Sequence, residues 1–443
     1  MSFTIKNLGL AFLFTTCLYG NAISQTSDIN LAPNPNLNEL IDFALKNTIE
    51  IKKAFISEEI GEREIASALS GWYPQINATG SFNHYIQMPT SVFGGNEVQV
   101  GQRNSSSMLF QADQAIFNPN LLQASRASKY IRSQYKQNTE ALKINTVVDV
   151  TKAYYDILTT EKQITIIEEN IARLQEQYNN AHVRYEVGLV DKTDFKRAQI
   201  SLNNSKADLK KTIEIRKYKY DYLKQLLSIS INYPLDLSYN NEDMETQIFI
   251  DTASTIDPNS RIEFRQLQTM RSMQQLNTQY QKWSMLPTLG IYSNYQLSYL
   301  NNNFGRLYSN NLPNSSVGLS LTIPIFQGTK RIQEIRKSEL QEAQLDWDAK
   351  QLNNIINTEY SAALANYKAN IVEWKNSKDN VTLSEEVYNT IKLQYDSGIK
   401  TYLDLMTAET DLRTSQLNYL NSLFAVLSSK IDVQKSLGII AVQ

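Results

Sequence analysis

The sequence offers few side chains that could carry out catalysis or hold a metal ion. It contains two histidines, His84 and His182, and a single cysteine, Cys17. We expect Cys17 to be removed on export, which excludes thiol chemistry, disulfides and Cys/His metal sites for the mature chain. Neither histidine stands in a recognisable motif, and the sequence contains no paired-carboxylate motif, phosphate loop or nucleophile elbow. The sequence therefore predicts no enzyme, no cofactor and no metal.

The charge balance excludes a second class of function. Lysine and arginine number 43 and aspartate and glutamate 45, which gives a formal net charge of −2. Nucleic-acid binding needs a basic field, so we expect no nucleic-acid partner. No apolar run of about eighteen residues follows the N-terminal segment, so we expect no α-helical membrane span, although alternating strands could still cross a membrane as a β-barrel.

Polar residues that recur in a fixed pattern lie in two matching stretches. Residues 185–202 align with residues 395–412 without a gap. The stretches share a tyrosine, a glycine, an aspartate and an alanine, namely Tyr185, Gly188, Asp194 and Ala198 in the first and Tyr395, Gly398, Asp404 and Ala408 in the second. A glycine that ends a long helix, followed by an aspartate and a new helical pattern, is typical of the tip of a helical hairpin.

Long heptad patterns lead into both tips and must position them. The first seam contains Val150, Ile157, Ile164, Ile171, Tyr178 and Tyr185, with Ala153, Thr160, Ile167, Leu174, Ala181 and Gly188 three places after each. The second contains Tyr360, Tyr367, Trp374, Val381, Tyr388 and Tyr395, with Ala363, Asn370, Ser377, Ser384, Ile391 and Gly398. Each is a coiled-coil seam. The sequence therefore contains two internal repeats, and many of their seam positions are small or polar.

Two strands are expected between the helices of each repeat, because the hydrophobic period changes there to two. They cover residues 75–86 and 107–117 in the first repeat, and 288–300 and 315–326 in the second. Loops rich in glycine, asparagine and serine join each pair, over residues 88–106 and 301–315. A soluble sheet would show the same alternation, so the pattern alone leaves open whether these strands meet lipid.

The N-terminus has the layout of a secretory signal peptide over residues 1–24. Lys6 precedes an apolar run from Leu8 to Leu18, and cleavage is expected after Ser24. A lipoprotein is the alternative, but Thr16 stands before Cys17 where a small residue such as alanine would be expected. The mature chain is therefore predicted to be exported.

The remaining chain divides into repeat 1 (residues 25–228), a connector (229–260) and repeat 2 (261–443). Each repeat consists of a helix, two strands, a long helix, a tip and a return helix. Asn36 and Glu39 predict the start of the first helix, which we expect to continue to Ser70. The long helix of repeat 1, over residues 121–187, would measure about 100 Å at 1.5 Å per residue. The first helix and the return helix, placed end to end, match that length.

With these repeats and tips the sequence resembles the TolC-like outer-membrane factors of bacterial efflux and type I secretion systems. The pattern Y-x-x-G, five residues and D occurs at both tips, and the resemblance covers the chain from about Leu37 to the end. It implies a mainly α fold with a small β part, in which long antiparallel coiled-coil hairpins form two repeats. It also implies that the four strands join a trimeric 12-stranded β-barrel in the bacterial outer membrane, with the helical part in the periplasm.

The resemblance also implies a function. A homotrimer would be the passive exit duct of a tripartite efflux or type I secretion system, receiving substrate from an inner-membrane transporter through a periplasmic adaptor (membrane fusion) protein. Cargo would be selected upstream, by the transporter. The alternative is an exported structural or adhesive coiled-coil trimer without transport activity, which would lack paired strands and matching tips.

Three groups of site residues follow from the resemblance. The implied gate contains Asp194, Tyr395, Lys400 and Asp404. The tips that would dock the adaptor contain Gly188, Leu189, Val190, Gly398 and Ile399. The side chains that would face outer-membrane lipid are Phe82, Tyr295, Leu297, Val317, Leu319 and Leu321.

The gate departs from the family pattern at two positions, and its aspartates have a simpler interpretation. Lys400 replaces the usual arginine and so lacks its bidentate fork, and Thr407 stands where a second aspartate would ring the opening. Asp194 and Asp404 could instead cap the return helices, where aspartate is favoured. Both roles can coexist.

Overall fold

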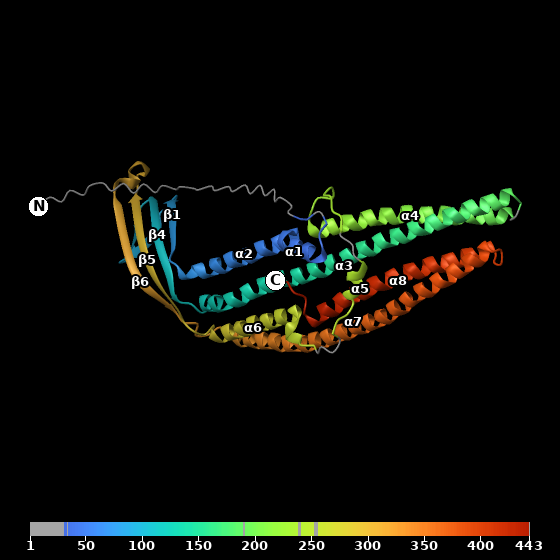
Figure 1. Cartoon of the computed structure of the whole chain (residues 1–443). Helices are drawn as coiled ribbons and strands as arrows, with labels where there is room; N and C mark the ends of the chain where they lie inside the picture. The colour runs from blue at the N-terminus through green and yellow to red at the C-terminus, as the bar shows by residue number, and fades with distance from the viewer. Residues whose placement is uncertain (1–30, 33, 189–190, 238–240, 252–255, 443) are drawn as a thin grey trace.

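The computed structural model describes residues 31–32, 34–188, 191–237, 241–251 and 256–442, so the expected signal peptide lies outside the described part. The molecule is elongated, with a β-sheet at one end and two helical hairpins that end at the other (Figure 1). Helices make up most of the described chain, and the two repeats follow the same order of elements. The mainly α fold with a small β part is therefore confirmed.

Repeat 1 contains two short helices, α1 (Leu37–Asn47) and α2 (Ile49–Leu69), the long helix α3 (Pro119–Glu186) and the return helix α4 (Lys192–Leu227). The helices α2, α1 and α4 follow one another along α3 (Figure 1). A single 3₁₀ turn, η1 (Ser70–Trp72), leads from α2 to the sheet. The expected arrangement, in which two shorter segments lie end to end beside one long helix, is present.

Repeat 2 contains α6 (Ile262–Trp283), the long helix α7 (Lys330–Asp396) and the return helix α8 (Tyr402–Leu437). The helices α6 and α8 both pack against α7 and against α3, so the two repeats lie side by side. The connector carries the short helix α5 (Asn241–Thr246) and the turn η2 (Pro258–Ser260). We refer to α3 with α4 as hairpin 1 and to α7 with α8 as hairpin 2.

The expectation of one unbroken first helix is wrong, because the helix is interrupted at Thr48. Its start is as expected, with Asn36 and Glu39 forming a capping box. Thr48 then adopts an extended conformation with φ −62° and ψ 140°. The backbone amide of Ile49 donates to the hydroxyl oxygen of Ser228 at 3.0 Å, a contact with the end of α4. A distant side chain therefore satisfies one amide that the interruption frees.

The main sheet has four antiparallel strands in the order β1, β4, β5, β6. Their bounds are Gln75–His84, Asn104–Phe117, Thr288–Asn301 and Asn311–Thr322. The strands at the two edges, β1 and β6, each have only one partner within the chain. Since β1 follows α2 and β6 precedes α7, the edges of the sheet continue into the two outer helices of the helical layer (Figure 1).

The connections within the strand pairs differ from expectation. The segment expected as a loop over residues 88–106 contains a separate hairpin, β2 (Thr90–Phe93) with β3 (Asn96–Gln99). The fourth strand covers Asn311–Thr322 instead of residues 315–326, because its pairing with β5 extends to Tyr299 opposite Asn311. The loop before it is correspondingly shorter and contains the turn η3 (Phe304–Ser309).

Two apolar clusters hold the hairpins together. The larger lies at the middle of the molecule, where α1, α3, α4, α7 and α8 meet the connector, and includes Val150, Ile157, Leu223, Leu427 and Ile248. The smaller, which we call the tip cluster, contains Ala181, Ala198, Tyr388, Tyr395, Tyr402, Leu405, Ala408 and Leu412. Both clusters join residues from the two hairpins, so the hairpins are packed against each other at the middle and at the tips.

The C-terminal end of α8 is fitted tightly against the connector. Gly438 caps the helix in the left-handed region, with φ +71°, and a Cβ at this position would lie 2.6 Å from the carbonyl oxygen of Ser260. Gly398 has nearly the same backbone conformation, with φ +77°, but a Cβ there would meet nothing within 4 Å. The two glycines therefore separate the effect of the conformation from that of the close contact.

We predict that Gly438→Ala lowers the thermal midpoint of the helical circular dichroism signal more than Gly398→Ala does. Each variant carries the penalty of a left-handed alanine, about 1–2 kcal/mol. Only Gly438→Ala adds a clash with backbone atoms. Equal shifts in the two variants would contradict the close approach of α8 to the connector.

Candidate functional site: the two hairpin tips

Each hairpin turns at a glycine in the left-handed region. Gly188 follows α3 with φ +78°, and Gly398 follows α7 with φ +77°. A Cβ at either position would meet nothing within 4 Å, so the conformation itself is what favours glycine. Apolar side chains beside the glycines are open to solvent, with Val187 64% and Ile399 74% exposed. Leu189 and Val190, which the sequence analysis places at the first tip, lie outside the described residues.

The return helices are capped differently at the two tips. In hairpin 2, the amide of Asp404 donates to the Thr401 hydroxyl and the amide of Thr401 donates to the Asp404 carboxylate at 3.0 Å, forming a capping box. The hydrogen bonds from Thr401 hold the pKa of Asp404 below its ordinary value. In hairpin 1 the cap is Asp191, whose side chain accepts from the amide of Thr193 at 3.2 Å. The interpretation as a helix cap therefore fits Asp404, whereas the N-cap of α4 is Asp191 and Asp194 lies in the first turn.

Tyr395 is buried between the hairpins, with 8% of its surface exposed. Its ring packs edge-on against Tyr402 at a centroid distance of 6.1 Å, and the guanidinium of Arg184 lies over the ring, 4.9 Å from its centroid. Burial raises the pKa of Tyr395, and the negative charge of Asp194 adds to the rise while Arg184 opposes it.

Lys400 is placed differently from the other expected gate residues. Lys400 is exposed. Among the described residues, no ion pair joins it to Asp194 of the same chain. The basic residue that contacts the buried tyrosine is Arg184, in the last turn of α3, which the sequence analysis did not single out. A basic residue at a helix C-terminus has a local explanation in the helix dipole, so its position gave no signal that it contacts Tyr395.

A second residue that the sequence analysis missed is Glu409 of α8, which is 2% exposed. Its carboxylate accepts hydrogen bonds from Asn170, Arg173 and Gln177 of α3, at 2.7, 2.7 and 3.0 Å. Glu409 follows Leu405 by four residues and precedes Leu412 by three, so it occupies the buried face of α8. The signal available in the sequence was a charged residue at a position where the helical spacing predicts a buried apolar side chain.

The six expected lipid-facing side chains all lie on one face of the main sheet. Directly opposite residues of paired strands share a face, and Tyr295 is opposite Phe110, which is opposite Ala78. The next rows along the same face place Leu297 opposite Met108, Phe82 opposite Ser106, Val317 opposite Ser293, Leu319 opposite Ile291, and Leu321 opposite Leu289. The other face is polar and includes the row of Asn77, Gln111, Asn294 and Ser316.

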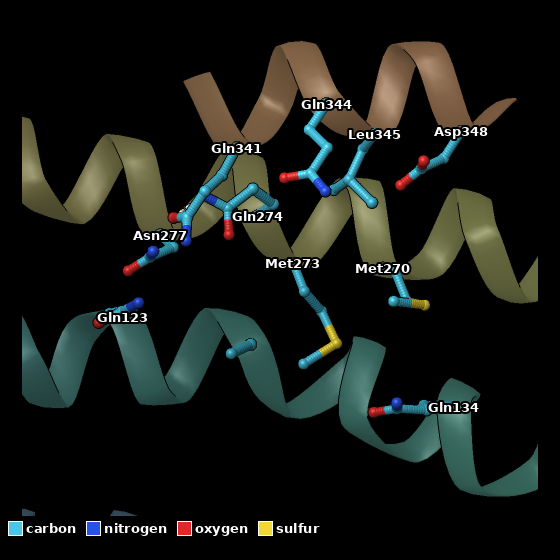
Figure 2. A pocket seen from close by; sticks show the side chains of 11 residues that line it. Gln123, Gln134, Met270, Met273, Gln274, Asn277, Gln341, Gln344, Leu345 and Asp348 are labelled. Atoms are coloured by element: carbon cyan, nitrogen blue, oxygen red, sulfur yellow. Dashed lines mark hydrogen bonds between the residues drawn. The ribbon is translucent and has the colours of Figure 1, made fainter. Parts of the chain in front are cut away.

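A groove of about 620 Å³ lies between α3, α6 and α7, near the sheet. Figure 2 shows side-chain amides from all three helices around it, including Gln134, Gln274 and Gln344, together with the thioethers of Met270 and Met273. Asp348 is its one ionisable group. The other polar lining groups are uncharged amides and thioethers, which supply no general acid, base or nucleophile, so Asp348 has no catalytic partner among the residues that line the groove.

The two histidines have structural contacts. His84 is hydrogen-bonded through Nδ1 to Asn104 at 2.6 Å, and His182 packs edge-on against Phe195 with a centroid distance of 4.8 Å. The described residues bring together no group of three or more His, Cys, Asp or Glu side chains that could hold a metal ion. Of the helices in this described part, none is long and apolar enough to cross a membrane.

Comparison with known proteins relates this geometry to a family. The family model "Outer membrane efflux protein" matches residues 40–228 and 260–439, which is most of both repeats. The chain is 20% identical over 424 residues to the outer membrane protein TolC of Vibrio cholerae, covering 92% of each protein. It is 22% identical over 382 residues to the outer membrane efflux protein BepC of Brucella suis, covering 84% of this chain and 79% of BepC.

Solved structures share the fold. The Campylobacter jejuni CmeC outer membrane channel has a TM-score of 0.72 at 18% identity, with 91% of this chain and 86% of CmeC covered. The open state of the Neisseria gonorrhoeae MtrE outer membrane channel has a TM-score of 0.74 at 18% identity, with 93% of each chain covered. These relatives are channels, not enzymes. The chain belongs to the outer membrane efflux protein family, as a TolC-like protein of the bacterial outer membrane whose helices extend into the periplasm.

Proposed function

We propose that this chain forms the passive exit duct of a tripartite efflux or type I secretion system, gated at its periplasmic tip. The observation that carries the proposal is the separation of two surfaces at opposite ends of one elongated molecule. An amphipathic sheet lies at one end and two matching hairpin tips lie at the other. The α3 helix of 68 residues that joins them is about 100 Å long at 1.5 Å per residue. Such a rod can connect the outer membrane with a partner deep in the periplasm.

The duct is a homotrimer with a shared 12-stranded barrel. A four-stranded sheet is too small to close on itself, since closed barrels need about eight strands. Its edge strands β1 and β6 have unpaired backbone groups on one side, which another copy can satisfy. Because β1 continues into α2 and β6 into α7, one head-to-tail contact repeated around an axis would pair both the strands and the helices. Three copies supply twelve strands.

Outer-membrane lipid covers the apolar face of the sheet. Five of the six expected side chains are exposed in the single chain, including Val317 at 73% and Leu319 at 67%, and Leu297 is partly exposed. Strands of 10–14 residues suit a hydrocarbon layer, which tilted strands of about 9–11 residues cross. The opposite face, with its asparagines, glutamines and serines, lines the water-filled interior.

The tips receive a periplasmic adaptor, which in turn joins the duct to an inner-membrane transporter. Gly188, Gly398 and Ile399, with Leu189 and Val190, form this docking surface, and the exposed Val187 extends it. Exposed apolar side chains beside glycines offer knobs and close backbone approach to another helical hairpin. The transporter, not the duct, selects the cargo.

A gate at the same tips keeps the resting duct closed. Tyr395 and Asp194 interact across the two hairpins, and Lys400 reaches Asp194 of a neighbouring copy instead of its own. Three copies of Asp404 near the axis attract cations and repel anions. The capping hydrogen bond between Thr401 and Asp404 fixes the position of the Asp404 carboxylate and is compatible with a role in cation selection.

We predict that the purified protein is a trimer in detergent and conducts in a planar lipid bilayer. Tyr395→Phe with Lys400→Ser should raise the resting conductance, because it removes two polar bonds that close the tip. Asp404→Ala should reduce the preference for cations over anions. A wild-type trimer without conductance would support the structural coiled-coil alternative, whereas wild-type conductance and selectivity in both variants would limit these residues to packing and capping.

We predict that cysteines on the two faces of β6 differ in reactivity. In intact cells, a membrane-impermeant maleimide should not label Leu319→Cys or Leu321→Cys, because lipid covers them. It should label Ser316→Cys and Ser320→Cys, which are on the opposite, water-lined face. Equal labelling of both pairs would contradict the lipid assignment. Cys17 does not interfere if the signal peptide is removed.

We predict that Val187→Asp with Ile399→Asp abolishes export while trimers persist, because charges replace the apolar docking surface. Export is measured in the native host as resistance to ethidium, deoxycholate and erythromycin, relative to a deletion strain. Phe249→Asp is the matched control, since Phe249 is 64% exposed but lies in the connector, away from the tips. Resistance at the wild-type level in the tip variant would contradict adaptor docking there.

A further inference from the structure

Glu409 is the point at which all four helices of the two hairpins meet through polar contacts. The donors Asn170, Arg173 and Gln177 are spaced by three and four residues on one face of α3. The hydroxyl of Ser205 in α4 donates to the side-chain oxygen Oδ1 of Asn170 at 2.9 Å and so fixes the orientation of the Asn170 side-chain amide. We call Glu409 with these four side chains the Glu409 network.

Hairpin 2 contributes a further partner from α7. Tyr388 is buried, and the guanidinium of Arg173 lies 5.8 Å from the centroid of its ring. Burial, together with the negative charge of Glu409, raises the pKa of Tyr388 to about 12. The tyrosine therefore stays neutral and able to donate throughout the physiological pH range.

Burial distinguishes Glu409 from the other carboxylates that join the hairpins. Its side chain is 3% exposed, compared with 60% for Glu176, 52% for Asp208 and 44% for Asp432. Exposed pairs can exchange their partners for water at little cost. A buried carboxylate cannot, and separating it from its donors leaves an unpaired charge. The network therefore opposes any displacement of α8 from α3.

The network lies next to the tip cluster and beside a small polar cavity. The cavity measures about 170 Å³ and is lined by Ser201, Asn204, Thr410 and Arg413 around Glu409. Two atoms of the network, Arg173 Nη2 and Gln177 Oε1, are buried and have no hydrogen-bond partner among the described residues. A polar cavity of this size can hold water. Water there could satisfy such atoms and solvate the carboxylate when the hairpins part.

Widening the tip requires hairpin 2 to move relative to hairpin 1, because the tip cluster packs the two together. We infer that Glu409 is a positioning residue that seats hairpin 2 on α3 and thereby biases the duct toward its closed state. This inference rests on the proposed gated duct. Glu409 lies about two turns into α8, away from the tip glycine Gly398, and acts through α3 rather than by lining the opening.

The test compares channel opening in planar bilayers. Glu409→Gln preserves the shape of the side chain and removes its charge, and should raise the ratio of open to closed time about fivefold or more, the lower range of measured coupling between sites. Arg173→Gln should act in the same direction. The double variant should open no more than the larger single variant, because both remove one interaction. Glu176→Gln is the matched control, since its pair with Lys392 also joins the hairpins but is exposed.

The outcomes are distinguishable from failure of the proposed function. If wild-type trimers do not conduct, the proposed duct itself fails. If wild-type trimers conduct and both Glu409→Gln and Arg173→Gln open as the wild type does, the inference is overturned while the duct stands. Lower thermal stability without a change in opening would also overturn it, because that is the signature of packing alone. Should Glu409→Gln fail to form trimers, the more exposed Arg173→Gln decides in the same way.

Discussion

The packing of one long helix against five others is the constraint on which the fold depends. The helices α1, α2, α4, α6 and α8 all pack against α3, whereas α7 packs mainly against α6 and α8 and reaches α3 through side chains such as Tyr388 and Tyr395. Because α3 extends along most of the molecule, one return helix cannot cover it, and shorter helices must lie end to end along its seam. Val150, Ile157, Ile164 and Leu174 along that seam are buried. The length of α3 therefore determines both the separation of sheet and tips and the layered arrangement of everything between them.

Buried threonines occur along several of these helices, and each helix satisfies them locally. Thr151 donates to the carbonyl oxygen of Val147 at 2.7 Å, and Thr160 to that of Asp156 at 2.7 Å. Thr212 and Thr278 make the same bond four residues back, at 2.8 and 3.2 Å. A hydroxyl that bonds its own helix can be buried without a partner on the neighbouring helix. Buried threonines are therefore compatible with close packing, whereas Asn370, Ser384 and Glu409 make their polar contacts with a neighbouring helix.

The sequence was sufficient for those features that repeat or depend on local chemistry. Heptad spacing predicts the long helices, the paired glycines predict the tips, and a period of two predicts the strands and their shared apolar face. The break at Thr48 was not predictable, because Thr48 is neither glycine nor proline and its freed amide is satisfied by Ser228, far away in the chain. The start of β6 was missed for the same reason, since its first residues are strand only through pairing with β5. The contact of Arg184 was also not predictable, because its partner, Tyr395, lies on the other hairpin.

The two repeats have the same sequence pattern but different environments. Tyr185 and Tyr395 occupy equivalent positions, yet Tyr185 is 38% exposed and Tyr395 only 8%. The residue equivalent to Glu409 in the first repeat is Gln199, which is partly exposed and accepts a bond from Lys196 of its own helix at 3.1 Å. Hairpin 2 therefore turns its tyrosine and its carboxylate into hairpin 1, whereas hairpin 1 presents the equivalent positions to solvent. The energetic cost of separating the two hairpins is therefore concentrated in the buried groups of hairpin 2.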